Sequence, residues 1–228
     1  MKKVLLSVSA MLISVVGFAQ ANVSSVDQTG WLNGALVSQV GTLNDSDVNQ
    51  WGLANIAAID QTGDKNQSRT DQIGLFNGAA VTQNGSENGA YIGQLGFLNL
   101  AEINQDGSGN DAGILQLGAG NYSSIKQTGN DNTAVNVQLW VGNSSSIVQN
   151  GDGNSAFEFQ GSLFNTANIN QTGNGNNASS LQLGEFNTSD IMQNGLDNIA
   201  ETVQVGDTHI STINQLGFGN VALVYQSN

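Results

Sequence analysis

The sequence predicts an all-β protein: a β-solenoid of about nine and a half two-strand coils, whose strands stack into two parallel, in-register cross-β sheets. The first observation behind this prediction is that glutamine occupies every eleventh position from Gln28 to Gln226, without one insertion or deletion. The second is that polar and apolar turns alternate, as in TGDKN after Gln61 and IGLFN after Gln72. The structural repeat is therefore 22 residues, one coil of two strands.

Each eleven-residue unit is expected to contain one strand and one turn. Gly follows the repeated glutamine after two residues in 16 of 19 units, Asn after five in 17 of 18, and Ala or Ser after seven in every unit. Val or Ile precedes it by two residues in 14 of 19. Asn, Ala or Ser, Ile or Val, and Gln therefore share one face of each strand. The residues between Gln and the next Asn contain the Gly that tight turns require, and we expect them to form the turn.

An eleven-residue period is also typical of a right-handed helical coiled coil. Gly in nearly every unit would cost about 1 kcal/mol each in a helix interior, and the Asn, Thr, Val and Ile residues add to this penalty. The composition therefore excludes the helical alternative.

Inward-facing amides are satisfied if each one hydrogen-bonds to its copy one coil above and below, forming ladders along the axis. The glutamines expected to form core ladders are Gln28, Gln39, Gln50, Gln61, Gln72, Gln83, Gln94, Gln105, Gln116, Gln127, Gln138, Gln149, Gln160, Gln171, Gln182, Gln193, Gln204, Gln215 and Gln226. The asparagines are Asn33, Asn44, Asn55, Asn66, Asn77, Asn88, Asn99, Asn110, Asn121, Asn132, Asn143, Asn154, Asn165, Asn176, Asn187, Asn198 and Asn220.

The first residues resemble a secretory signal peptide. Lys2 and Lys3 precede an apolar stretch and the small-residue site Gly17-Phe18-Ala19, so we expect residues 1–19 to be cleaved. Residues 20–23 are then a short mature N-terminus, and residues 24–228 the solenoid. No later segment has the length of a membrane span, so the mature chain is expected to be secreted without one.

Composition argues against several classes of function. After removal of the signal peptide, only Lys65, Arg69 and Lys126 oppose 18 acidic residues, so nucleic acid and anionic membranes are poor partners. The chain has no cysteine, and its single histidine, His209, replaces an Asn of the repeat. We therefore predict no catalytic residue, no metal site and no cofactor. The Trp residues 31, 51 and 140 are expected in turns, where packing is a simpler role than stacking on sugars.

Five positions depart from the Val or Ile that precedes the glutamine by two, and multiples of 22 separate them, so they share one sheet: Thr70, Asn136, Glu158, Ser180 and Thr202. One interpretation is a local shift of facing that turns Phe residues inward around an irregular coil between residues 134 and 164. The other is that this sheet and its apolar turns form a stripe for lateral fibre bundling. The residues of that possible lateral interface are Val135, Val137, Phe157, Phe159, Leu181 and Val203.

Acidic residues occur in polar turns and at outward positions, including Asp45, Asp47, Asp64, Asp106, Asp131 and Asp152. We expect them to delay premature stacking by charge repulsion. Calcium binding, as in Gly/Asp-rich β-rolls, is the alternative, but those repeats have nine residues and a regular aspartate.

Four stretches match Gln-x-Gly-x-Gly-Asn-x-Ala-x-x-x-Gln at every specified position: 105–116, 149–160, 171–182 and 215–226. This pattern resembles the curlin repeat of curli fibre subunits. The resemblance implies a non-enzymatic subunit of extracellular functional amyloid fibres, which serve in biofilm matrix and cell adhesion. It also implies self-assembly, a nucleator subunit, an outer-membrane export channel and soluble accessory proteins as partners. By position, it assigns polymerisation to Gln28, Asn33, Asn220 and Gln226.

Three alternatives remain open at the level of sequence. The uniform coils favour the major fibre subunit over the surface nucleator. A monomeric secreted solenoid adhesin would have the same fold, but neither end of the repeat array has an atypical polar cap, and uncapped ends favour open filaments. An ice-binding solenoid is disfavoured because the outward positions carry no regular Thr array.

Overall fold

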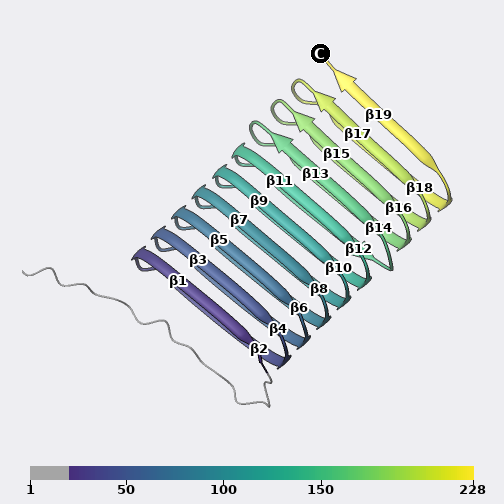
Figure 1. Ribbon diagram of the computed structural model, residues 1–228. Coiled ribbons are helices and arrows are strands. Elements are labelled where there is room, and N and C mark those ends of the chain that lie inside the picture. The colour runs from purple at the N-terminus through teal and green to yellow at the C-terminus, as the bar shows by residue number, and fades with distance from the viewer. Residues whose placement is uncertain (1–20) are drawn as a thin grey trace, which may run out of the picture.

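A computed structural model describes residues 21–228, so the predicted signal peptide lies outside the described residues. In the described part, nineteen strands coil into a β-solenoid with two flat sheets, β1 at one end of the rod and β19 at the other (Figure 1). The predicted fold class, the 22-residue coil and the two parallel sheets are confirmed. No helix that could cross a bilayer occurs in residues 21–228.

Odd-numbered strands form a ten-stranded sheet, hereafter the odd sheet, and even-numbered strands form a nine-stranded even sheet. The odd sheet consists of β1 (Val23–Trp31), β3 (Asp45–Leu53), β5 (Gln67–Leu75), β7 (Gly89–Phe97), β9 (Asp111–Ala119), β11 (Thr133–Val141), β13 (Ser155–Gly161), β15 (Asn177–Leu183), β17 (Ile199–Val205) and β19 (Val221–Ser227). The even sheet consists of β2 (Gly34–Thr42), β4 (Ile56–Asp64), β6 (Gly78–Ser86), β8 (Leu100–Ser108), β10 (Tyr122–Asn130), β12 (Ser144–Asn150), β14 (Thr166–Asn174), β16 (Thr188–Leu196) and β18 (Ile210–Phe218).

Every strand pairs in parallel with the strand one coil away, in a register of 22 residues. Between β4 and β6, for example, Ile59 lies beside Val81 and Gln61 beside Gln83. Identical repeat positions therefore stack along the whole rod, as the ladders require.

The strands are longer and the turns shorter than the sequence prediction. A typical strand such as β4 continues three residues past its glutamine, to Asp64, and only Lys65 and Asn66 remain as the turn before β5. The prediction was wrong because positive-φ glycine does not end the ladder here. Gly63 still pairs with Gly85 of the next coil in register. Similarly, Trp31, Trp51 and Trp140 lie within the ends of strands rather than in turns.

Two positions in each eleven-residue unit need backbone conformations that favour glycine, for different reasons. At the first, two residues after the glutamine, Gly63 has φ 115°, and a Cβ there would lie 1.9 Å from the carbonyl oxygen of Gly85. At the second, two residues later, Lys65 has φ 57°, the left-handed region. A side chain fits at the second position at a cost of about 1 kcal/mol. The first is therefore nearly always Gly, while the second varies.

A narrow core fills the space between the sheets. Its apolar part is a column of fully buried Ile residues, including Ile103, Ile125 and Ile147, flanked by small buried residues such as Ala101 and Ala134. Each buried Ile side chain contributes about 1.5–3 kcal/mol of hydrophobic stabilisation. The small Ala or Ser lets the sheets approach each other.

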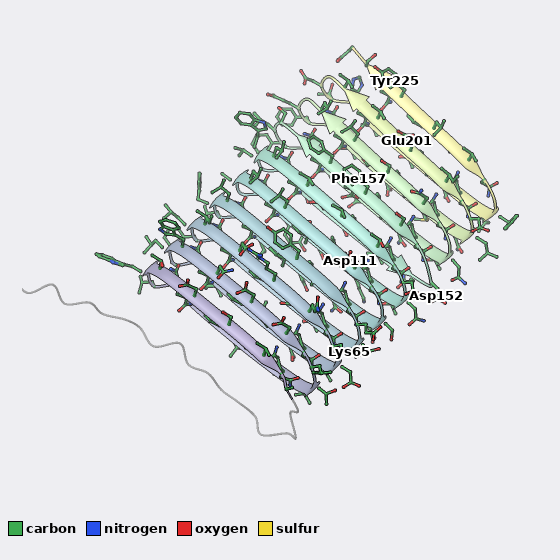
Figure 2. All side chains as sticks on the ribbon, in the orientation of Figure 1. Lys65, Asp111, Asp152, Phe157, Glu201 and Tyr225 are labelled. Carbon is green, nitrogen blue, oxygen red and sulfur yellow. The ribbon has the colours of Figure 1, made fainter. Side chains whose placement is uncertain are left out.

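The two edges of the flattened solenoid differ in character. We call the turns after odd strands, with the strand ends that lead into them, the apolar edge, because they expose Trp51, Phe76 and Phe97. The turns after even strands form the polar edge, on which Lys65 and Asp152 lie (Figure 2).

One interpretation of the sequence was that the strands between residues 134 and 164 turn their Phe side chains inward. This interpretation is wrong, because the same alternate positions face the core there as in the other coils. Ala134, Asn136 and Glu158 are fully or almost fully buried, whereas Phe157 is exposed on the outer face of β13. A one-residue shift would move every core residue of the strand to the outside, including its ladder glutamine. Keeping the register costs less than that, even with a carboxyl group in the core.

Candidate functional site: axial amide ladders and their open ends

Each internal glutamine of the ladder satisfies both of its side-chain N–H groups. Gln61 is fully buried, and its Nε2 donates to Oε1 of Gln83, 2.8 Å away in the next coil. The same Nε2 donates to the carbonyl oxygen of Asp45 at 3.0 Å, at the start of a strand in the opposite sheet. The glutamines therefore link successive coils along the axis and also tie the two sheets together at each edge.

The asparagine ladder organises the turns. Asn88 donates from its backbone N and from Nδ2 to Oδ1 of Asn66, at 3.2 and 3.0 Å. Its Nδ2 also donates to the carbonyl oxygen of Gly107, 3.0 Å away in the next coil. Each Asn side chain therefore links its own turn to the turns above and below, which accounts for its constancy in a two-residue turn.

Both ladders have a direction. From Gln28 to Gln204, each glutamine Nε2 donates to the glutamine of the next coil toward the C-terminal end of the rod. The asparagine ladder runs the opposite way, because Asn Nδ2 groups donate to the Asn of the preceding coil, as from Asn88 to Asn66. Among the described residues, nothing donates to Oε1 of Gln28. The Nε2 of Gln226 donates to the carbonyl oxygen of Ile210, which leaves one N–H for a further acceptor. The two ends of the rod therefore present complementary hydrogen-bonding groups.

The residues assigned to polymerisation lie in the end coils. Gln28 and Gln226 are half-buried, although the glutamines of the middle coils are fully buried. Asn33 is half-buried in the first turn of the apolar edge, and Asn220 is exposed in the last turn of the polar edge. The Oδ1 of Asn33 accepts from Asn55, and Asn220 donates to Oδ1 of Asn198. The inward faces of the end strands are thus only partly covered.

His209 ends the asparagine ladder of the apolar edge. Its backbone N donates to Oδ1 of Asn187 at 2.9 Å, as an Asn would. Its ring Nε2 lies 3.2 Å from the carbonyl oxygen of Val205, which replaces the turn contact of an Asn amide. His209 thus substitutes for an amide within its own coil.

A polar cluster interrupts the apolar column of the core at Glu158. The Nδ2 of Asn136 lies 3.4 Å from Oε2 of Glu158, and Ser145 of the opposite sheet donates its hydroxyl to the same oxygen. Within the described residues, Oε1 of Glu158 and Oδ1 of Asn136 have no partner. Burial raises the pKa of the Glu158 carboxyl to about 8 from its ordinary value of 4.5, and the hydrogen bonds from Ser145 and Asn136 oppose this rise. The carboxyl is therefore mostly protonated in the folded protein at neutral pH.

The residues proposed as a lateral interface lie on the outer face of the odd sheet. Val135 and Phe157 are exposed, and the other four members, Val137, Phe159, Leu181 and Val203, are half-buried. They form a modest patch on β11 to β17, and Glu201 lies beside it (Figure 2).

Sequence reasoning named Trp31, Trp51 and Trp140 on the apolar edge but did not identify its other exposed residues. Four of these residues lie directly before the repeated Asn of their turn and project from the rod because their backbone is left-handed: Leu32, Phe76, Leu98 and Phe164. The sequence showed that these turns are apolar. The signal that could have identified the projecting residues is their position directly before the repeated Asn.

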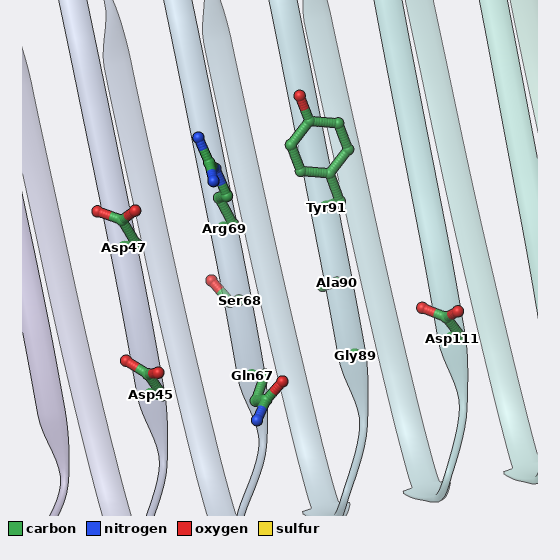
Figure 3. Close-up of a pocket in the computed structure, with 9 residues that line it drawn as sticks. All are labelled: Asp45, Asp47, Gln67, Ser68, Arg69, Gly89, Ala90, Tyr91 and Asp111. Carbon is green, nitrogen blue, oxygen red and sulfur yellow. The ribbon is translucent and has the colours of Figure 1, made fainter.

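The outer face of the odd sheet also carries a shallow depression around Arg69, with Asp45, Asp47, Tyr91 and Asp111 on its lining (Figure 3). Arg69 pairs with Asp71 through Nε at 2.8 Å. In residues 21–228, no three His, Cys, Asp or Glu side chains gather closely enough to hold a metal ion.

Comparison with protein families identifies the repeat. A family model of the curlin associated repeat matches residues 77–107, 99–129 and 107–139. These overlapping matches cover the segment from Asn77 to Leu139, which contains one of the four complete copies of the motif, Gln105 to Gln116. The resemblance to the curlin repeat is confirmed. A comparison with curated proteins gave no match.

Proposed function

Because the chain carries the curlin associated repeat within a β-solenoid, we propose that it is a structural subunit of extracellular curli-type amyloid fibres that polymerises end to end. The role is non-enzymatic. Its primary partner is a second copy of the chain, and a nucleator subunit, an export channel and soluble accessory proteins are further partners in this proposal. Residues 1–19 direct secretion, and the fibres contribute to biofilm matrix and adhesion.

The direction of the ladders is the observation that carries the proposal. When the N-terminal end of one copy meets the C-terminal end of another, the free Oε1 of Gln28 or Gln39 meets a free N–H of Gln215 or Gln226. Meeting of two N-terminal ends would place acceptor against acceptor. Stacking therefore proceeds head to tail, an association that does not close on itself and gives open filaments.

The backbone supports the same geometry. Strands β1 and β2 at one end, and β18 and β19 at the other, each pair on one side only. Their unpaired N–H and C=O groups are templates for another chain. Docking of a second copy would satisfy them and cover the partly exposed inward faces of the end strands.

Assembly of purified residues 20–228 tests this function. We expect a lag, acceleration by preformed seeds, thioflavin binding and a cross-β diffraction pattern with a spacing of about 4.8 Å. A chain that folds but stays monomeric at micromolar concentration, with or without seeds, would show the proposal to be wrong.

A sharper test uses the inward and outward residues of β19. Gln226→Leu removes the last donor of the ladder, so we expect wild-type seeds to elongate slowly with this variant. Tyr225→Ser, one residue earlier on the same strand and exposed on the outer face, is the matched control and should elongate normally (Figure 2). Equal elongation rates for the two variants would remove Gln226 from the polymerisation site.

A further inference from the structure

The apolar edge is a continuous row of exposed side chains that the end-to-end contacts leave uncovered. Large apolar residues protrude from seven of its first eight turns, with Trp31 79% and Trp51 and Trp140 each 66% exposed. Phe164 and Phe186 of successive coils stack with ring centroids 5.4 Å apart and planes inclined by 15°. Monomeric proteins rarely expose apolar patches of this extent without a binding role.

Backbone conformation fixes the direction of these side chains. Phe76, Leu98 and Phe164 have φ of 55°, 56° and 54° at the left-handed position of their turns. Placing a bulky residue there costs about 1 kcal/mol, and Gly occupies the same position in other coils. The left-handed backbone therefore holds these side chains outward at a cost in stability. Within their own coil the side chains remain exposed.

Charge selects the partner of the edge. Its first seven turns, up to Asn165, contain no charged residue. The polar edge carries Asp64, Glu87 and Asp152, and the outer faces of the sheets carry acidic residues such as Glu102 and Glu201. Two copies that approach by any other side bring like charges together, which is unfavourable. Approach of one apolar edge to another avoids this repulsion and buries the exposed rings.

We propose that the apolar edge is the lateral interface between fibres, and that it pairs with the apolar edge of a second copy in a neighbouring fibre. This proposal rests on the proposed fibre function. It keeps the apolar turns of the stripe expected from the sequence and replaces the listed residues of the sheet face, because Trp51, Phe76, Leu98 and Phe164 take the central place rather than Phe157.

The area of the edge makes pairing dependent on polymerisation. Eight coils at about 4.8 Å each, across a sheet separation of about 10 Å, give roughly 400 Å² per subunit. Stable interfaces bury about 800 Å² per partner. A single subunit is therefore too small to pair, while a row of subunits in a fibre adds its contacts and exceeds the requirement. Filaments form first and bundle afterwards.

The test replaces Phe76, Leu98 and Phe164 together by Asn, which tolerates the left-handed conformation. Its matched control replaces Lys65 and Glu87 by Asn, at the equivalent turn position of the polar edge, where φ is 57° and 58°. Seeded elongation, electron micrographs and low-speed sedimentation are recorded for wild type, edge variant and control. We expect the edge variant to elongate within twofold of wild type but to give single filaments, with at least a tenfold loss of material in the low-speed pellet.

Three other outcomes would overturn the proposal. Bundles of the edge variant equal to those of wild type would exclude the edge as the interface. Loss of bundling in Phe157→Ser but not in the edge variant would assign it to the sheet face. If wild type and all variants give single filaments, and only wild type and the control bind polystyrene beads, then the apolar edge binds a foreign apolar surface instead of a second fibre. Absence of filaments from wild type would instead refute the proposed function itself.

Discussion

The buried carboxyl of Glu158 should make the stability of the solenoid, and of the proposed fibre, depend on pH, and Glu158→Gln should remove that dependence. In the folded protein the group has a pKa of about 8, whereas 4.5 is its ordinary value in an unfolded chain. Between these values the folded state binds more protons than the unfolded state. Stability therefore falls as pH rises from about 4.5 to 8 and stays low above that range. Gln has nearly the same shape, carries no charge at any pH, and can donate where the protonated carboxyl would.

The magnitude follows from the pKa difference at about 1.36 kcal/mol per unit. At pH 7 the carboxyl costs about 3 kcal/mol, and above pH 8 about 5 kcal/mol. The groups around it, Asn136 and Ser145 by direct contact and Ser180 by strand register, are uncharged, so no other titration in the cluster offsets this term. Glu158→Gln should be more stable than wild type by about these amounts at the two pH values.

The concentration of unfolded monomer that remains in equilibrium with fibres measures this effect, because the carboxyl of Glu158 is buried in every folded copy and reaches water only in the unfolded chain. For wild type it should rise about 100-fold or more between pH 5 and pH 8, because 1.4 kcal/mol corresponds to tenfold. Glu158→Gln should show a far smaller rise. Glu201→Gln, which removes an exposed carboxylate from the outer face of β17, is the control for net charge and should follow wild type. Parallel pH curves for wild type and Glu158→Gln would refute the reasoning.

Three further predictions concern the ladders and turns. Gly151→Ala should abolish assembly, because its Cβ would lie 2.1 Å from the carbonyl oxygen of the next coil, whereas Gly153→Ala, with open space around it, should cost only about 1 kcal/mol in denaturant-induced depolymerisation. Gln116→Leu leaves one N–H of Gln94 and Oε1 of Gln138 without partners, while the other N–H of Gln94 still donates to the carbonyl oxygen of Gly78, and should destabilise the fibre by about 1–3 kcal/mol per group, measured in the same way. Added salt should shorten the lag of thioflavin kinetics by screening acidic repulsion, and an unchanged lag would dismiss that role.

The fold could be predicted from the sequence because one period carried nearly all the information. A glutamine every eleven residues, with alternating turn polarity, determines strand number, register and coil length. Turn boundaries were less predictable. Glycine such as Gly63 normally indicates a turn, but in a stack of identical coils it also allows backbones to approach closely, and the ladder continues through it.

The orientation of β13 depended on two costs that the sequence alone did not rank: the cost of burying the carboxyl of Glu158 and the cost of turning the strand over. Glu158 beside Phe157 and Phe159 suggested that the strand turns over, because a buried carboxyl is costly. Turning the strand over would instead bury both Phe side chains in the narrow core and remove Gln160 from its ladder, and the neighbouring coils hold the register on both sides. A proton on Glu158 is the cheaper solution, at about 3 kcal/mol at neutral pH.

The coil that contains β13 combines several departures from the repeat. Glu158 replaces a core Val or Ile, and Ser162, with φ 101°, occupies the position where close approach favours Gly. Trp140, with φ 78°, occupies that position one coil earlier. In a solenoid each coil contacts only its neighbours, so stability is a sum of local terms and a weak coil is not rescued by distant ones. We therefore expect the coils of β11 to β14, where Asn136, Trp140, Glu158 and Ser162 depart from the repeat, to be the least stable part of the rod, and protonation of Glu158 to strengthen them.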